Sequence, residues 1–411
     1  MQYTLGQNAR FKLDLLFEGV RYSEALGAAA EHAFPNFYPY RFQKDEPDPT
    51  GAGKAIIPYL LRSKAGTVVR IKGAAESAWQ VQGSAADGYH LVHDDGTRHD
   101  IDFAPLPQWM QATTEDGYPM AQTGLSLHGD MGVINVAPGC EYFLNKIERQ
   151  SMRCTFCAYG APDKRTQNLG QEAGVINLPS RTYERIQETL RTALSEHQLR
   201  HLYLVGGSMT DWHDEGRRFI EIARAVRDAN ITNVPVTCGS GAIPNEIMDE
   251  LHAEELVQAV CFNLEVWSRP LFEKICPGKN HYVGYDRWLS ALEYGVQRWG
   301  RERVYSAMVA GIELEPEYNM DWQEAADLAL QGAEDLCARG VIPIYSLYWP
   351  VGGRDHPQYM SRLKGYFERL MVGYQEIRER HGLKIWPGFM CTECAYMQME
   401  CDMDLEGVVP K

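Results

Sequence analysis

The chain has 411 residues, of which 45% are hydrophobic and 23% are charged, and its formal net charge is −15. This composition is typical of globular proteins and excludes a disordered chain, and the length allows two or three domains. A net negative surface repels phosphate backbones, so we do not expect nucleic-acid binding as a main activity. No window reaches about 18 uninterrupted apolar residues and the first residues do not form a signal peptide, so we expect a cytoplasmic protein without a membrane segment.

The first region, residues 1–128, is predicted to be an α+β module that supports the fold or recognises a substrate. A helix is expected over residues 11–32, followed by segments that Pro and Gly punctuate. The expected antiparallel strands cover 68–72, 79–81 and 90–92, and the sequence Asp94-Asp95-Gly96 is typical of a hairpin turn. No catalytic cluster lies in this region.

The second region, residues 129–350, alternates β-branched runs with helices of 3.6-residue periodicity. The expected strands cover 132–137, 201–205, 234–238, 259–264, 304–310 and 341–348. Parallel strands joined by right-handed crossovers form either an open doubly wound sheet or a barrel, complete or partial. In both folds, ligands bind at the carboxyl ends of the strands. A third region, residues 351–411, contains a long helix over 359–380 and a cysteine-rich tail.

In a reducing compartment the ten cysteines do not form a disulfide framework, and clustered thiols there more often bind metal or react. Two groups stand out, namely Cys140, Cys154 and Cys157, and Cys391, Cys394 and Cys401. The other four, Cys238, Cys261, Cys276 and Cys337, are expected mostly in the core.

The first cysteine group predicts a metal site on the loop that follows the first strand of the second region. A C-x2-C pair brings two sulfurs to one metal group, and a third sulfur can come from any loop that folds back. Three thiolates without a fourth protein ligand nearby suit an iron–sulfur cube with one open iron, whereas structural zinc takes four ligands. A Cys3His zinc site with a distant histidine is the alternative.

Cys140, Cys154, Cys157, the aromatic Phe156 and the six β/α units resemble the radical S-adenosylmethionine superfamily over about residues 129–350. The resemblance implies a partial (β/α)6 TIM-like barrel in which the three cysteines hold a [4Fe–4S] cluster. It also implies that the fourth iron binds the amino and carboxylate groups of S-adenosylmethionine. The superfamily's usual spacing is C-x3-C-x2-C, whereas this chain has C-x13-C-x2-C, so the position of Cys140 departs from the pattern.

Further segments at the strand ends match the superfamily in part and predict contacts with S-adenosylmethionine. The end of the second strand resembles a Gly-Gly-Glu segment whose backbone meets the amino group of the cofactor, with Ser208 in place of the glutamate. The end of the fifth strand is similar to the segment that flanks the adenine, and residues 350–353 follow the sixth strand in a comparable position. The residues concerned are Gly206, Gly207 and Ser208, then Gly311, Ile312 and Glu313.

Asn263 and Glu265 stand two apart near the end of the fourth strand, so they are expected to point to the same face. Polar groups on an apolar strand need partners, which ribose hydroxyls or a carboxylate would supply. A buried hydrogen-bond network without a ligand is the alternative. In the following loop, Lys274 and Lys279 flank amides that can hold a carboxylate or a phosphate, and a solvated loop is the alternative.

The C-x2-C-x6-C spacing of the tail is a metal-ligand spacing and resembles the auxiliary-cluster segments of some radical S-adenosylmethionine enzymes. A second iron–sulfur cluster there would relay electrons, bind the substrate or donate sulfur. Cys276, Asp402 or a substrate atom would complete its ligands. A structural zinc clip with a remote ligand is the alternative.

The resemblance implies an enzyme that cleaves S-adenosylmethionine reductively to a 5′-deoxyadenosyl radical, which takes hydrogen from a small biosynthetic substrate. The reaction then ends in rearrangement, dehydrogenation or sulfur insertion, and a flavodoxin or ferredoxin supplies electrons. One alternative is a peptide-modifying maturase whose first region grips a peptide or carrier protein. A non-catalytic zinc-binding protein is an alternative of another class. The sequence identifies no catalytic acid or base.

Overall fold

The computed structural model describes residues 3–31, 37–42, 44, 48, 50–137, 139–157, 178, 180–196, 198–318, 320–348, 357–406 and 408–410. The chain divides into two compact units, of which one comprises Met1–Pro107 with Cys391–Lys411 and the other Gln108–Met390. The boundaries expected from the sequence lie at residues 128 and 350 and differ from this division. The last 21 residues of the chain thus belong with its beginning.

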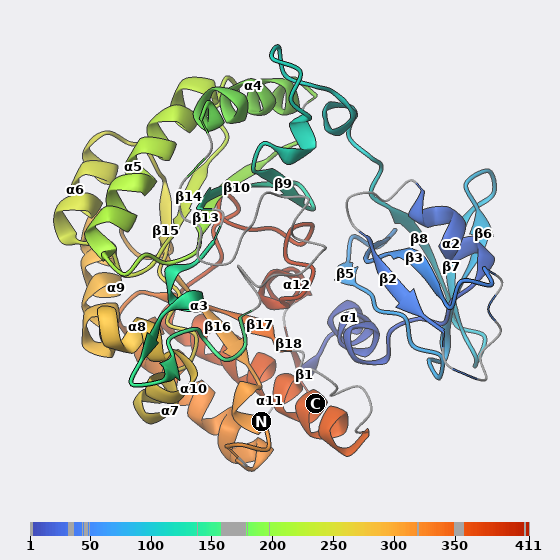
Figure 1. Cartoon of the computed structure of the whole chain (residues 1–411). Helices are drawn as coiled ribbons and strands as arrows, with labels where there is room; N and C mark the ends of the chain where they lie inside the picture. Colours follow the sequence, from blue (N-terminus) through green and yellow to red (C-terminus); the bar gives the residue numbers. More distant parts are fainter. Residues whose placement is uncertain are drawn as a thin grey trace. The chain divides into compact units, whose positions relative to one another are not determined.

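The unit Gln108–Met390 is built on a curled seven-stranded sheet that forms a half-barrel (Figure 1). The strand order is β17-β16-β15-β14-β13-β10-β9, and every neighbouring pair is parallel except β9 and β10. The strands are β9 (Leu125–His128), β10 (Met131–Ala137), β13 (His201–Gly206), β14 (Val236–Gly239), β15 (Ala259–Cys261), β16 (Val304–Ala310) and β17 (Ile342–Leu347). The predicted partial barrel is confirmed, and β9 is an additional edge strand.

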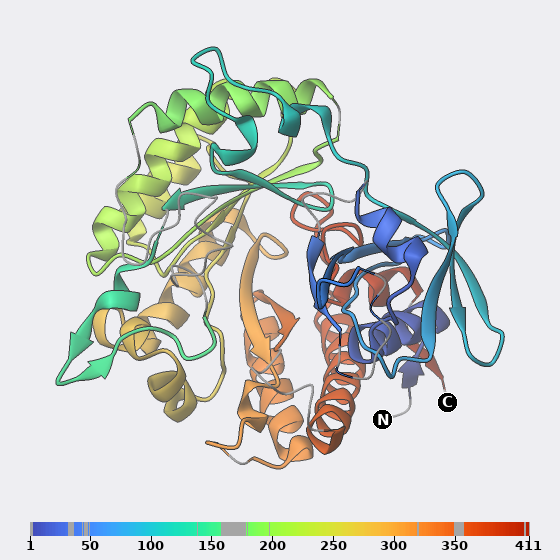
Figure 2. The same ribbon diagram turned by 45° about the vertical axis from the view of Figure 1, so that its right-hand side comes forward.

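Helices cover the outer face of this sheet (Figure 2). They are α4 (Thr182–Ser195), α5 (Trp212–Ala229), α6 (Asn245–Ala253), α9 (Tyr285–Trp299), α10 (Trp322–Ala338) and α11 (Pro357–His381). Asp211 and Asp321 cap α5 and α10 by accepting hydrogen bonds from two backbone N–H groups each. Short helices lie in the loops, namely α3 (Glu141–Leu144), α7 (Arg269–Ile275) and α8 (Pro277–Tyr282), with 3-10 turns at Gln108–Gln111, Met120–Gln122 and Ile312–Leu314.

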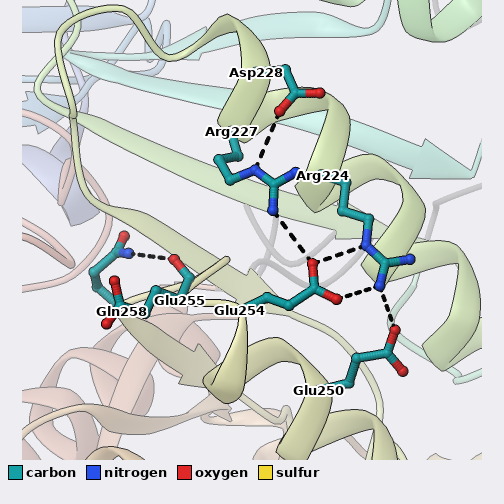
Figure 3. A network of polar contacts seen from close by, with 7 residues as sticks. All are labelled: Arg224, Arg227, Asp228, Glu250, Glu254, Glu255 and Gln258. Carbon is teal, nitrogen blue, oxygen red and sulfur yellow. Dashed lines mark hydrogen bonds and ion pairs between the residues drawn. The ribbon is translucent and has the colours of Figure 1, made fainter.

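Charged side chains link α5 to the end of α6 on the outer surface (Figure 3). Arg224 donates to Glu250 over 2.6 Å and also to Glu254, which accepts from Arg227 over 3.3 Å. These groups are partly exposed, so the network fixes the helix pair with a modest gain in stability.

Aromatic residues of the segment after α11 pack on the strands of the same unit. The ring of Phe389 stacks on Tyr305 of β16 with 3.7 Å between centroids and meets Tyr203 of β13 edge-on. The Tyr305 hydroxyl donates to the Glu302 carbonyl and accepts from the Trp386 backbone N–H. Tyr305 is therefore a fully engaged core residue.

The other unit contains a five-stranded antiparallel sheet of order β5-β4-β8-β7-β6 and a separate β2-β3 hairpin. Its elements are β1 (Tyr3–Leu5), α1 (Gln7–Glu18), α2 (Glu24–Ala30), β2 (Phe37–Arg41), β3 (Lys54–Pro58), β4 (Leu60–Ser63), β5 (Val68–Arg70), β6 (Trp79–Ser84), β7 (Gly88–His93), β8 (Arg98–Phe103), α12 (Glu400–Glu406) and β18 (Val408–Pro410). The expected helix 11–32 is two helices, because Gly19 ends α1 with φ of 69°. The predicted turn joins β7 to β8, where the Gly96 N–H donates to the His93 carbonyl.

The tail is part of this unit's core. Tyr396 packs with Leu60, Val68 and Ala104, and the Arg70 N–H donates to the Tyr396 carbonyl over 2.9 Å. The last strand, β18, pairs with β1 in antiparallel register. Within the part of the chain that the structure describes, no helix is long and apolar enough to cross a membrane.

Candidate metal and cofactor site

The loop after β10 carries the three cysteines of the first group. Cys140 lies directly before α3, and the chain then forms the small hairpin β11 (Lys146–Ile147) and β12 (Gln150–Ser151). It returns to a tight turn in which the Cys157 N–H donates to the Cys154 carbonyl over 3.1 Å. The long spacer is thus folded structure, which returns the second and third cysteines toward the first.

The ends of β10 and β13 meet at Cys140. The Glu141 N–H donates to the Ser208 carbonyl over 2.9 Å, and a Cβ on Gly207 would lie 2.1 Å from the Gly139 oxygen and 2.7 Å from the Cys140 Cα. Only glycine permits this approach. Burial raises the pKa of Cys140 to about 11, against hydrogen bonds from the backbone of Ser208 and Tyr142. The Gly206, Gly207 and Ser208 segment therefore lies against the first cysteine.

Cys154 is buried and lies beside a fourth thiol. A hydrogen bond from Cys276 lowers the pKa of Cys154, and the Lys279 ammonium acts in the same direction. The charge of Cys154 also acts to raise the pKa of Cys140. Sequence reasoning assigned Cys276 to the core or to the tail cluster, since nothing in the spacing relates it to Cys154.

The donor set is one that iron–sulfur clusters use. Cysteine sulfurs are soft ligands that suit iron–sulfur clusters and zinc. Four sulfurs around one zinc at 2.3 Å lie about 3.8 Å apart. Among the described residues, the sulfurs of Cys140, Cys154 and Cys157 do not all lie within 4.8 Å of one another.

The expected strand 259–264 is shorter in the structure, because β15 ends at Cys261 and Glu265 has a left-handed φ of 72°. The Asn263 side chain accepts a hydrogen bond from the Cys261 thiol. Glu265 instead forms a buried ion pair with Lys279, with 2.5 Å between Oε1 and Nζ.

The third predicted contact segment follows β16. Gly311 has φ of 96° and leads into the 3-10 turn that contains Ile312 and Glu313. A Cβ on Gly311 would lie 2.2 Å from Leu363 of α11. Glu313 is 5% exposed, and its Oε2 has no hydrogen-bond partner among the described residues. Residues 350–353, expected beside this segment, lie outside the described residues.

Burial raises the pKa of Glu313 to about 7 from an ordinary value of 4.5. The charged form is therefore destabilised in the folded protein: stability is unaffected below pH 4.5 and falls as the pH rises toward 7. By linkage, the cost at pH 8 is on the order of 3 kcal/mol. We expect Glu313→Gln to remove this dependence, so that the variant gains stability over the parent at pH 8 but little at pH 4.5. Thermal unfolding at both pH values measures the difference.

Glu317 on the same loop is exposed and provides the control. Glu317→Gln should unfold like the parent at both pH values. An equal shift of the Glu313→Gln variant at pH 4.5 and pH 8 would contradict the buried, raised carboxyl.

Two further carboxylates hold the loops of the site, and sequence reasoning missed them. Glu215 of α5 is 5% exposed and accepts hydrogen bonds from the backbone N–H groups of Met209 and Gly241, each over 2.9 Å. Glu141 accepts from the backbone N–H and the hydroxyl of Thr210. Glu215 stands four residues before Phe219 on the apolar stripe of α5, and this signal of a buried acid was available in the sequence.

In the tail, Cys391 and Cys394 are neighbours, since the Cys391 N–H donates to the Cys394 sulfur over 3.2 Å. Cys401 lies in α12, where burial raises its pKa well above the usual range. Asp402 is occupied by an ion pair with Lys12 at 2.5 Å. Cys276, the other residue proposed to complete the tail ligands, lies beside Cys154 instead.

Comparison with known proteins gives one curated relative, and no family model matches the chain. The relative is the bacteriochlorophyllide c C-7(1)-hydroxylase of Chlorobaculum limnaeum, which is 22% identical over 268 residues, covering 60% of this chain and 59% of the relative. The chain therefore spans less than two thirds of that protein.

Two solved structures also resemble the chain. A radical SAM methyltransferase from Sphaerobacter thermophilus is 14% identical, with 75% of this chain and 76% of that chain covered and a TM-score of 0.38. The cobalamin-dependent S-adenosylmethionine radical enzyme OxsB is 14% identical, with 73% of this chain and 38% of that chain covered and a TM-score of 0.34. At such scores, neither structure bears on the function of the chain.

A cysteine loop at the carboxyl end of a half-barrel strand, together with the curated relative, supports the radical S-adenosylmethionine superfamily for this chain. The superfamily implies an enzyme with a [4Fe–4S] cluster and S-adenosylmethionine as cofactors.

Proposed function

We propose that Cys140, Cys154 and Cys157 hold the [4Fe–4S] cluster of an enzyme that abstracts hydrogen from a small biosynthetic substrate. The observation that supports the proposal is the folded spacer between Cys140 and Cys154, in which the Met152 N–H donates to the Asn145 carbonyl over 3.0 Å, together with the electrostatic effect of Cys154 on Cys140. When bound, the cluster and S-adenosylmethionine supply the 5′-deoxyadenosyl radical. The catalytic acid or base, if the reaction needs one, stays unassigned.

The residues of the chain bind and orient the cofactors. Gly207 and Ser208 bring their backbone to the edge of the site beside Cys140. Among the described residues, Oε2 of Glu313 has no hydrogen-bond partner, and this oxygen can accept a hydrogen bond from the adenine amino group. Glu215 and Glu141 keep the loops after β13 and β14 in place, which preserves the geometry that hydrogen transfer needs.

The test is anaerobic reconstitution of the full chain with iron and sulfide, followed by dithionite and S-adenosylmethionine. We expect 5′-deoxyadenosine, measured by chromatography with mass detection. A reconstituted protein with a filled cluster that yields no 5′-deoxyadenosine would refute the proposal. A protein that takes up one zinc and no iron would favour the non-catalytic zinc-binding alternative.

For the steps that follow hydrogen abstraction, we propose a class of reaction. Rearrangement, dehydrogenation and sulfur insertion all start with hydrogen abstraction, and the hydroxylase name of the curated relative adds hydroxylation. Electrons would come from a flavodoxin or a ferredoxin. A peptide or carrier protein that copurifies with the unit containing β2–β8 would favour the maturase alternative.

We further propose a second iron–sulfur cluster on Cys391, Cys394 and Cys401, supported by their spacing and by the contact of the first two. Replacing all three with alanine should lower the iron content of the reconstituted protein but leave 5′-deoxyadenosine formation detectable, because the first group is intact. Iron analysis and the cleavage assay on the same sample measure both. Unchanged iron content would contradict the second cluster.

A further inference from the structure

The corner between α7 and α8, residues 275–278, is fastened to the cysteine loop at two points. The Thr155 N–H donates to the Ile275 carbonyl and the Gly278 N–H donates to the Met152 carbonyl, both over 2.9 Å. These bonds flank Cys154 on the loop and Cys276 on the corner. The two cysteines are therefore held opposite each other by the backbone itself.

Side chains strengthen the same contact. A Cβ on Gly278 would lie 2.4 Å from the Met152 oxygen and 2.7 Å from the ring of Tyr142, so the approach requires glycine. Tyr142 stacks on Tyr282 of α8 with 5.1 Å between ring centroids, and the Asn145 amide donates to the Tyr282 hydroxyl over 2.7 Å. Gly278 and Tyr282 thus contact the cysteine loop both near Cys140 and near Cys154.

A buried positive charge lies directly after the corner, at the next residue of α8. Lys279 is only 8% exposed and donates to the Asn263 carbonyl over 2.7 Å, in addition to its ion pair with Glu265. Its Nζ is 4.8 Å from the ring centroid of Trp288. The ammonium also acts electrostatically on both Cys154 and Cys276.

Glu265, the residue that pairs with Lys279, has an energetically costly backbone conformation. Glu265 has φ of 72°, which is uncommon for a residue with a side chain. Its backbone is fixed to β16, since its N–H donates to Ala307 and its carbonyl accepts from Val309. Such strain persists where the surrounding structure overdetermines it, and it often marks functional sites.

We propose that Cys276 and Lys279 are positioning residues that set the reduction potential of the iron–sulfur group held by Cys154. The backbone bonds place the Cys276 thiol where it can donate a hydrogen bond to the Cys154 sulfur, and the Lys279 ammonium acts on that sulfur as a positive charge. Both contacts stabilise the reduced state, which carries one more negative charge, and so raise the potential. The inference rests on the proposed function, because it needs a redox-active cluster at Cys154.

The test is a redox titration of the anaerobically reconstituted full chain, followed by electron paramagnetic resonance. Cys276→Ala removes the donor and should lower the potential, whereas Cys276→Ser keeps a donor and should stay nearer the parent. Replacing Lys279 and Glu265 together by Met and Leu removes both charges of the pair without leaving a buried charge alone, so this variant should have a lower potential than Glu265→Gln, which keeps the ammonium. Glu265→Gln leaves the ammonium without its counter-charge and should raise the potential.

The expected size is about tenfold in the one-electron reduction equilibrium for Glu265→Gln, which corresponds to 59 mV for one electron. If all four variants keep iron and titrate at the parent potential, the inference is overturned and the proposed function stands. Loss of iron in Cys276→Ala with the fold intact would make Cys276 a ligand and would also overturn the positioning role. If the parent binds no cluster, the proposed function and the inference both fail.

Discussion

Replacing Cys154 or Cys157 with alanine should reduce 5′-deoxyadenosine formation by more than about a hundredfold, the upper end of the loss seen for residues that only support metal ligands. Each variant removes one of the three thiolates that are proposed to hold the cluster. Cleavage of S-adenosylmethionine by the reconstituted variants, measured beside the parent, checks this expectation.

Cys337 provides the matched control for these substitutions. It is fully buried in α10 and is not one of the cysteines of the proposed cluster sites. Cys337→Ala should keep both iron content and cleavage, and this result would show that a buried cysteine can be replaced without loss of activity. Product formation at parental levels by Cys154→Ala or Cys157→Ala would remove the assignment of the ligands.

Lys12→Met should destabilise the unit that contains the tail by about 3–5 kcal/mol, the usual cost of removing one partner of a buried ion pair. Lys12 is fully buried in α1, bonds to Asp402 at 2.5 Å and donates to the Ala395 carbonyl at 2.7 Å. Without the ammonium, the buried Asp402 carboxylate loses its counter-charge. Chemical unfolding, with proteolysis of the tail as a local readout, measures the effect.

Two controls separate the lost pair from a general effect of substitution. The double variant Lys12→Met with Asp402→Leu should recover much of the stability, because no charge is left buried alone. Lys64→Met, which breaks an exposed ion pair with Asp102, should leave unfolding unchanged. If Lys12→Met unfolds like Lys64→Met, the buried pair does not fasten the tail.

The barrel could be predicted from the sequence because each of its strands has a local signal. β-branched runs between amphipathic helices mark β10, β13, β14, β15, β16 and β17, and only the antiparallel edge strand β9 was missed. The early end of β15 could not be predicted. Apolar and polar residues still alternate from Phe262 to Glu265, as they do in a strand, but the backbone leaves the extended conformation at Glu265. The strand pattern alone does not reveal a left-handed residue.

The surroundings of Cys154 could not be predicted, because they depend on contacts between distant segments. Cys276 and Lys279 follow Cys154 by more than 120 positions, and their contact arises from the backbone bonds of Ile275 and Gly278. A solvated loop was a reasonable expectation for Lys279, since lysines are rarely buried unless paired. Its partner, Glu265, was instead expected to face a ligand.

The tail was recognised as a cysteine-rich segment, but its place in the fold was not. Tyr396 and the pairing of β18 with β1 join it to the unit formed by the first 107 residues. Pairing between the two ends of a chain leaves no local mark in the sequence. Lys12 offered no signal either, because a lysine in an amphipathic helix is normally solvated.

The most direct test of the account is the electron paramagnetic resonance spectrum of the dithionite-reduced, reconstituted chain before and after S-adenosylmethionine is added, with Cys391, Cys394 and Cys401 replaced by alanine. We expect a [4Fe–4S] signal whose shape changes when S-adenosylmethionine binds, because one iron of the cluster on Cys140, Cys154 and Cys157 has no protein ligand. A spectrum that does not respond to S-adenosylmethionine, or a protein that holds one zinc and no iron, would contradict it.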